Sequence, residues 1–191
     1  MMKYLLLPFV LSVMFLSAAR ASTTDITLTA NILNTSCQVT VDNGGRINLG
    51  TVDLDYLNKN TDVDQVYSGG APFAITVSNC APAGGKNPTK LTVNFTPIAG
   101  ALAPTNQQVF ANQSVGGASN VGIVILSTQD AQNIFNVLDS HGQTRSIYSV
   151  TPDQLNNGAY HFHARMQKIA PAEAATSGLV KASVFVSVYY E

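Results

Sequence analysis

The stretch SGLVKASVFVSVYYE, residues 177–191, carries an apolar strand to the last residue of the chain. Alternate positions of this strand share one face, which collects small, aliphatic and aromatic side chains: Val180, Ala182, Val184, Val186, Val188 and Tyr190. No turn signal and no polar tail follow it. Because a long apolar strand at the edge of a sheet invites pairing with other chains, this strand needs a neighbour on both sides. The neighbour comes either from elsewhere in the chain or from another molecule.

A second amphipathic strand is predicted near the start of the chain, in TDITLTANILNTSC, residues 24–37. One face of it carries apolar residues: Ile26, Leu28, Ala30 and Ile32. The opposite face carries Thr27, Thr29 and Asn31. Two amphipathic strands therefore flank the rest of the chain.

Residues 1–21 are typical of a secretory signal peptide. Lys3 precedes an apolar run from Leu5 to Leu16, and small residues surround a cleavage site before Ser22. The run is short for a helix that spans a bilayer. We expect an exported protein of residues 22–191, which is a suitable length for one domain.

Charge excludes several classes of partner. The formal net charge is -1, only 11% of the residues are charged, and the lysines and arginines are scattered along the chain. Nucleic acids and anionic membranes attract clustered basic residues, which this sequence does not have. We therefore expect no nucleic-acid partner.

The chain has two cysteines, Cys37 and Cys80. In an exported protein such a pair predicts one disulfide, which would stabilise the fold by about 4 kcal/mol on the chain-entropy estimate. The spacing does not fit the C-x-x-C motif of redox enzymes.

Alternating apolar and polar residues predict an all-β protein. The predicted strands cover residues 38–41, 46–52, 72–80, 90–97, 121–127, 159–166 and the closing segment. Turn-rich segments separate them at residues 42–45, 81–88, 114–120 and 156–158. Short strands with turns between them favour an antiparallel β-sandwich with Ig-like Greek-key topology.

Catalytic motifs are missing from the sequence, so neither an enzyme nor a cofactor is predicted. A pair of histidines, His161 and His163, could begin a metal site on one face of a strand. Their alternation with Tyr160, Phe162 and Ala164 favours a simpler arrangement, in which these three side chains face the core. His161, His163 and Arg165 are then expected to face solvent, and no metal site is predicted.

Two further segments resemble ligand sites only in composition. Asp53, Asp55, Asp62 and Asp64 are residues of the type that binds calcium, but the glycine and the closing glutamate of an EF-hand loop are missing. We expect a solvated loop there. The glycine-rich segment 116–122 leads into a strand and not into a helix, so it is interpreted as a turn and not as a phosphate site.

The two ends together resemble the pilins of the bacterial chaperone–usher pathway. The shared features are the penultimate aromatic Tyr190, Gly178 at the fourteenth position from the end, the alternating apolar residues between them, the N-terminal extension before Cys37, and Cys80 some forty residues later. ASNVGIVILS, residues 118–127, resembles a strand in the middle of the pilin domain. The resemblance spans residues 22–191.

The resemblance implies a fold and an assembly mechanism. Such pilins have an incomplete Ig-like sandwich of six strands, and a groove beside the C-terminal strand takes the place of the missing seventh strand. A periplasmic chaperone fills the groove until the N-terminal extension of the next subunit replaces it, by β-augmentation. An outer-membrane usher and neighbouring pilins are the other implied partners, and the surface fimbria is the implied location; a host receptor is not identified.

Carried onto this chain, the resemblance divides it into a signal peptide (1–21), a donor-strand extension (22–36) and a pilin domain (37–191). The donor candidates are Ile26, Leu28, Ala30 and Ile32. The residues expected to face the groove or the chaperone are Gly178, Val180, Val184, Val186, Val188, Tyr190 and Glu191. The implied function is a structural fimbrial subunit that supports adhesion. Two alternatives stay open, a minor or tip-associated adhesive subunit and a complete secreted metal-binding β-sandwich.

Overall fold

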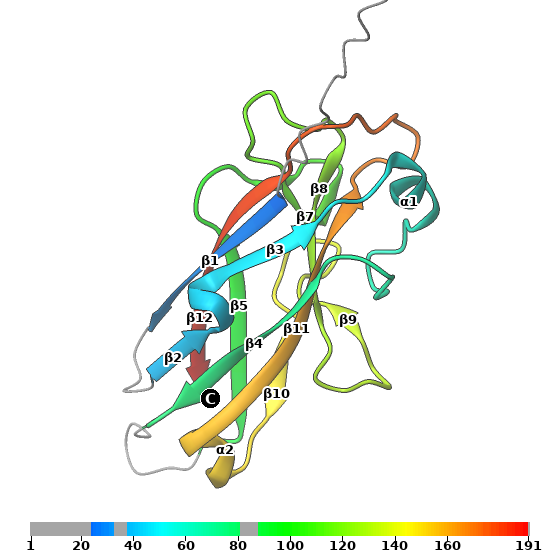
Figure 1. The fold of residues 1–191 in the computed structure, drawn as a ribbon. Helices are drawn as coiled ribbons and strands as arrows, with labels where there is room; N and C mark the ends of the chain where they lie inside the picture. The colour runs from blue at the N-terminus through cyan, green and yellow to red at the C-terminus, as the bar shows by residue number, and fades with distance from the viewer. Residues whose placement is uncertain (1–23, 33–37, 81–87, 191) are drawn as a thin grey trace, which may run out of the picture.

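The computed structural model describes residues 24–32, 38–80 and 88–190. Two β-sheets pack against each other into a sandwich, and the two short α-helices lie at opposite ends of it (Figure 1). In chain order the elements are β1 (Thr24–Ile32), β2 (Gln38–Val41), the 3-10 helix η1 (Asp42–Gly45), β3 (Arg46–Gly50), α1 (Leu54–Lys59), β4 (Ala71–Ser78), β5 (Lys90–Pro97), β6 (Leu102–Ala103), β7 (Asn106–Ala111), β8 (Val121–Ser127), β9 (Phe135–Asn136), β10 (Ile147–Ser149), α2 (Pro152–Asn156), β11 (Asn157–Lys168) and β12 (Lys181–Tyr190). The predicted signal peptide lies outside the described residues.

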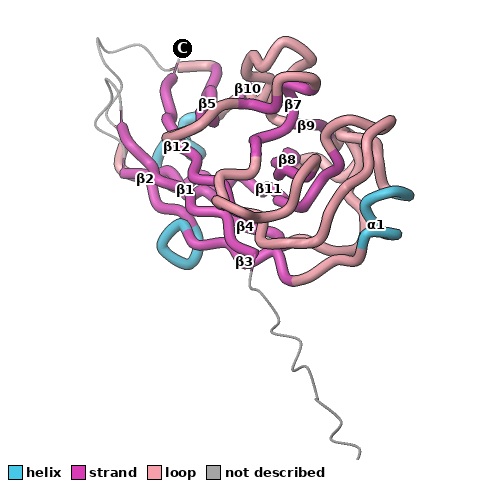
Figure 2. Tube along the Cα trace, turned by 90° about the horizontal axis from the view of Figure 1, so that it is seen from above, coloured by secondary structure: helices cyan, strands magenta, loops and turns pink. Residues whose placement is uncertain are grey.

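The strands form two sheets with different edges. The first sheet has the order β10-β5-β12-β1-β3, and the second has the order β2-β4-β11-β8-β7-β6, with β9 paired to β8. Figure 2 looks at these strands from above and shows β12, β1 and β3 on one side of the molecule. Among the described strands every pairing is antiparallel except that of β1 with β12. The predicted all-β, Ig-like sandwich is confirmed.

The long predicted strands lie where the apolar periodicity placed them. β2, β5 and β8 have the predicted bounds, and β3, β4 and β11 differ from them at their ends. β6, β7, β9 and β10 were not predicted from the sequence. These strands are short or rich in polar residues, as in NQQVFA of β7, so they lack a clear period of two.

Aromatic rings from both sheets meet in the core. Phe162 of β11 lies 5.5 Å from Phe73 of β4 and 5.1 Å from Phe95 of β5, measured between ring centroids. All three side chains are almost fully buried. Since β5 belongs to the other sheet, this cluster joins the two layers, and rings that pack edge to face contribute beyond their buried area.

β8 is buried along its whole length. One face of it joins the main core through Ile123 and Ile125, and the other face packs Val124 and Leu126 into a second apolar cluster with Val109 of β7. A continuous apolar run is typical of a strand that is covered on both faces. The run VGIVILS is explained by these two clusters.

The segment 53–64, predicted to be a solvated loop, contains the short helix α1. The Asp53 carboxylate accepts a hydrogen bond from the Tyr56 N–H at 2.6 Å, which satisfies a free donor of the first turn. Leu57 is buried and anchors the helix. The loop prediction was wrong here because one and a half turns are too short to show a helical period. No helix among the described residues has the length and apolar character needed to cross a membrane.

Candidate functional site: the strand slot beside the C-terminal strand

β12 is not an edge strand, because β1 lies beside it. β1 runs parallel to β12 over eight residue pairs, from Asp25 opposite Lys181 to Ile32 opposite Val188. On its other side β1 pairs antiparallel with β3. We call the position between β12 and β3 the β1 slot (Figure 1). The chain's own N-terminal strand therefore supplies the neighbour that the closing strand needs.

Two of the four predicted donor residues, Ile26 and Leu28, are buried on one face of β1. Ile26 and Leu28 are 0% and 3% exposed and belong to the main core, whereas Thr29 is exposed. Ala30 and Ile32 have register positions opposite β12, but their side chains lie outside the described part of the chain. Period-two alternation thus sends alternate side chains of β1 into the sandwich.

β12 borders the slot on one side, and the apolar face that begins at Val180, just before β12, and continues along this strand lies in the core. Its buried members, none more than 2% exposed, are Val180, Ala182, Val184, Val186 and Val188. Tyr190 is half-buried, and burial raises its pKa to about 12. Glu191 lies outside the described residues.

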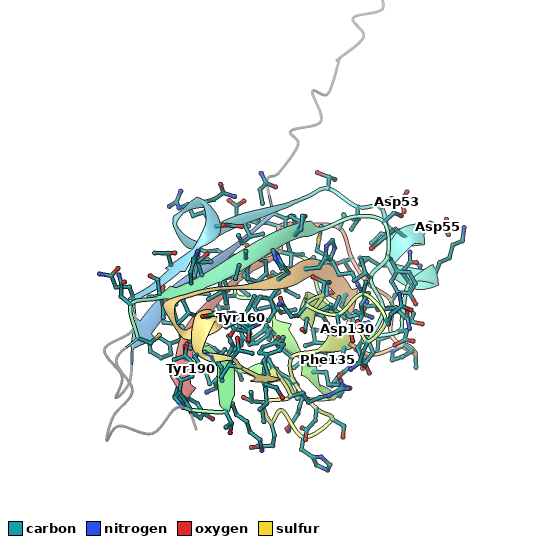
Figure 3. All side chains as sticks on the ribbon, turned by 90° about the horizontal axis from the view of Figure 1, so that it is seen from below. Asp53, Asp55, Asp130, Phe135, Tyr160 and Tyr190 are labelled. Carbon is teal, nitrogen blue, oxygen red and sulfur yellow. The ribbon has the colours of Figure 1, made fainter. Side chains whose placement is uncertain are left out.

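Tyr190 also connects the end of β12 to the cysteine after β4. Its hydroxyl group lies 3.2 Å from Cys80 Sγ, to which it can donate a hydrogen bond. In Figure 3 Tyr190 lies on the same side of the molecule as Tyr160 and far from Asp53 and Asp55 on the α1 side. Cys80 is disulfide-bonded. Cys37 lies outside the described residues, so its pairing with Cys80 stays a prediction.

Gly178 allows a close crossing of two backbones just before β12. Its φ is +152°, and a methyl group there would lie 2.5 Å from the Ala118 nitrogen and 2.7 Å from the Gly117 carbonyl carbon. Both distances are shorter than real Cβ contacts. A glycine is therefore required for the turn at residues 117–118 to pass over the start of the C-terminal strand.

Asn112 and Gln113 hold the first residues of β12 from the side. The Asn112 side-chain amide donates to the carbonyl oxygens of Ala118 and Leu179 at 2.9 Å each, and its Oδ1 atom accepts from the Lys181 N–H. The Gln113 Oε1 atom accepts from the Ser183 N–H at 2.9 Å. Neither residue was predicted to have a role, because an Asn–Gln pair after a polar strand carries no sequence signal of its own.

Charged residues surround the entrance of β1 on its solvent face. Asp25 has register positions opposite Lys181 of β12 and Asn48 of β3, and Arg46 stands two register positions further along β3, opposite Thr27. Asp25, Lys181 and Arg46 line one small surface pocket. An acidic residue of β1 thus lies between two cationic residues that belong to the slot.

The two histidines of β11 lie on the predicted outer face, but Arg165 does not face solvent. His161 is exposed, and His163 is half-buried with Nε2 2.9 Å from the Gly69 carbonyl oxygen. Burial lowers the pKa of His163 below its ordinary value of 6.5. Tyr160, Phe162 and Ala164 face the core as predicted.

Arg165 is 0% exposed, so its predicted exposure was wrong. Its guanidinium donates to the carbonyl oxygens of Asp62, Gln65 and Met166 and to Gln167 Oε1. It also lies 4.9 Å from the Tyr67 ring centroid. The loop that follows α1 covers this part of the sheet, and the period of a strand does not show what lies over its outer face.

The acidic residues of the segment 53–64 do not converge. Asp53 caps α1, Asp55 pairs with Lys59, and Asp64 accepts from Arg145 and from the Asn136 N–H. Among the residues that the structure describes, no group of three or more His, Cys, Asp and Glu side chains could hold a metal ion.

Comparisons with solved structures found similar folds. The chain is similar to the P pilus rod subunit PapA, with a TM-score of 0.49 and 16% identity over 75% of this chain and 90% of that one. It is also similar to the CupB6 tip adhesin from Pseudomonas aeruginosa, with a TM-score of 0.47 and 13% identity over 88% of this chain and 41% of that one.

The sequence comparisons are more specific. The family described as "Fimbrial protein" matches residues 26–191. The uncharacterized fimbrial-like protein YadK of Escherichia coli strain K12 is 44% identical over 168 residues, which cover 87% of this chain and 85% of that protein. A match over nearly all the described residues and a relative of this identity lead to one conclusion. The chain belongs to the fimbrial protein family, and it is a structural subunit of a pilus and not an enzyme.

Proposed function

We propose that this fimbrial subunit joins its neighbours by donor-strand exchange. In the pilus, β1 leaves its own slot and fills the slot of the neighbouring subunit, where it completes the sheet beside that subunit's β12. The observation that carries the proposal is that β1 occupies this slot in its own chain and buries Ile26 and Leu28 there. A strand that completes its own fold can complete the fold of a second copy with the same contacts.

The contacts of β1 are strong enough to sustain a fibre. Complete burial of a large aliphatic side chain contributes roughly 1.5–3 kcal/mol, so Ile26 and Leu28 together contribute about 3–6 kcal/mol. Main-chain hydrogen bonds to β12 and β3 add to this. The mode of binding is β-augmentation, in which the ladder gives affinity and alternate side chains give the register.

Before assembly, a periplasmic chaperone protects the slot, and an outer-membrane usher exchanges the chaperone for a neighbouring subunit. The predicted signal peptide and the family membership support this route. An exposed β12 would present a row of valines along an open edge, which favours aggregation. A chaperone strand in the slot prevents this in the same way as β1 does in the single chain.

The subunit supports adhesion as part of the fibre. A subunit at the tip ends the polymer and has no neighbour to which it would donate a strand. The presence of β1, with two core side chains on one face, favours a shaft or minor subunit that both donates and accepts.

Substitutions on the two faces of β1 test the proposal. We expect Leu28→Asp to abolish the ladder of SDS-resistant multimers, because a carboxylate in an apolar slot has no partner. Deletion of residues 22–33 should have the same effect, because it removes the donor strand. Thr29→Asp is the matched control, since Thr29 is exposed and its substitution leaves the apolar face intact. Multimers of undiminished length from Leu28→Asp, or a greater loss from Thr29→Asp, would show that β1 is not the donor.

A further inference from the structure

The segment η1, residues 42–45, lies where the chain crosses from one sheet to the other. β2 before it pairs with β4 in the second sheet, and β3 after it pairs with β1 in the first sheet. Asn43, Gly44 and Gly45 all have positive φ, which allows the sharp crossing. The Asp42 carboxylate accepts from the Ala74 N–H at 2.7 Å and ties the crossing to β4. The crossing is therefore held in place next to the β1 slot.

Gly45 is the point at which this crossing meets the backbone of β1. It is buried, and a methyl group built on it would overlap the Leu28 carbonyl oxygen and lie 3.1 Å from the Leu28 carbonyl carbon. The obstacle is main chain and not the end of a flexible side chain, so it cannot turn away. Gly44 beside it differs in one respect, because a methyl group there would have no atom within 4 Å.

We propose that the missing side chain of Gly45 leaves the space that the backbone of an inserted strand needs, and that Gly45 thereby decides whether a subunit can accept a strand. The inference rests on the proposed function and names its acceptor-side determinant. Because the contact is with a carbonyl group of the inserted strand, it does not depend on the side chains of that strand. The strand of a neighbour at the same depth meets the same limit as the chain's own β1.

This placement separates acceptance from donation. Gly45 is part of the slot, whereas Leu28 is part of the inserted strand. A Gly45→Ala subunit keeps an intact β1 that it can no longer dock in itself, so it can donate but not accept. A Leu28→Asp subunit has an unobstructed slot but a defective strand, so it can accept but not donate.

Mixing the variants tests the inference, with SDS-resistant multimers as the readout. We expect Gly45→Ala alone and Leu28→Asp alone to stay monomeric and their mixture to form a dimer that does not grow further. Gly44→Ala is the matched control: it carries the same left-handed backbone strain as Gly45→Ala without the overlap, so it should still polymerise. Multimers from Gly45→Ala as long as those from the parent chain would overturn the inference.

If Gly45→Ala accumulates poorly, thermal unfolding of the same proteins still tests the inference. In the parent background Gly45→Ala should lower Tm by about 5–10 °C more than Gly44→Ala, on the usual scale of 2–4 °C per kcal/mol for a chain of this size. In the Leu28→Asp background, where β1 is not docked, the two alanine variants should have equal Tm and equal yield. A larger loss from Gly45→Ala there as well would show a purely local defect and overturn the inference.

These outcomes separate the inference from the proposed function. If the parent chain forms no SDS-resistant multimers, donor-strand exchange fails. The inference about Gly45 is then decided by the thermal comparison, which requires only the chain's own β1. If the parent polymerises and Gly45→Ala matches it, donor-strand exchange stands and the role of Gly45 is wrong.

Discussion

Truncation of the buried side chains of β1 should lower the free energy of unfolding. The largest possible loss is the free energy with which this strand docks in its slot. The substitutions are Leu28→Ala, Ile26→Ala and the double variant. The two residues are 3% and 0% exposed and belong to one core cluster. If donor-strand exchange operates as proposed, β1 differs from an internal strand, because it leaves the sheet while the rest of the sandwich stays folded.

The magnitudes follow from burial. A Leu or Ile to Ala change in a core costs about 2–5 kcal/mol, so simple addition predicts roughly 4–10 kcal/mol for the double variant. The two side chains contribute only about 3–6 kcal/mol to docking, however. Once β1 has left the slot, a second truncated side chain in β1 removes no further packing contact. The double variant should therefore lose clearly less than the sum of the single variants, which is the non-additivity expected of coupled sites.

Urea unfolding measures this in the purified chain. Because the sequence contains no tryptophan, far-UV circular dichroism and tyrosine fluorescence are the probes. Thr29→Ala, on the exposed face, is the control and should stay within about 0.5 kcal/mol of the parent. Full additivity would show that β1 unfolds only with the whole domain. A loss below about 0.5 kcal/mol from Leu28→Ala would show that the strand does not fill the slot in solution.

Three further predictions concern residues around the slot and the sheet behind it. Gly178→Ala should destabilise the chain by about 1–3 kcal/mol in the same assay through overpacking, whereas Gly116→Ala, which meets no atom within 4 Å, should lose less. Arg165→Leu should cost roughly 2–3 kcal/mol, because buried carbonyl groups lose their donor, and should speed proteolysis of the loop after α1; unchanged cleavage would contradict the contacts of the guanidinium. Burial lowers the pKa of His163 in the folded chain. As the pH falls below 6.5, the unfolded chain therefore takes up the proton first, which favours unfolding. The contribution of neutral His163 to the free energy of unfolding is complete above pH 6.5 and is lost below it. The slope of stability against pH below 6.5 should shrink in His163→Gln, and an unchanged slope would contradict this assignment.

Local patterns in the sequence were sufficient for the fold class and for the faces of the long strands. Alternation placed Ile26 and Leu28 on one side of β1 and the valines of β12 on one side of the closing strand, and both sets are buried. A period of two follows from the geometry of an extended chain, so it can be recognised before any partner is known. The same reasoning indicated that the closing strand needs a neighbour.

Which strand takes that place was decided only by the tertiary structure. The sequence contains two amphipathic ends, but their pairing in parallel, with Asp25 opposite Lys181, depends on the path of the whole chain between them. The burial of Arg165 depends on a loop a hundred residues earlier in the chain. Gly45 resembles any turn glycine until the Leu28 carbonyl group is placed against it. Contacts between distant segments leave no period in either segment, so local patterns predict the strands and their faces but not what covers them.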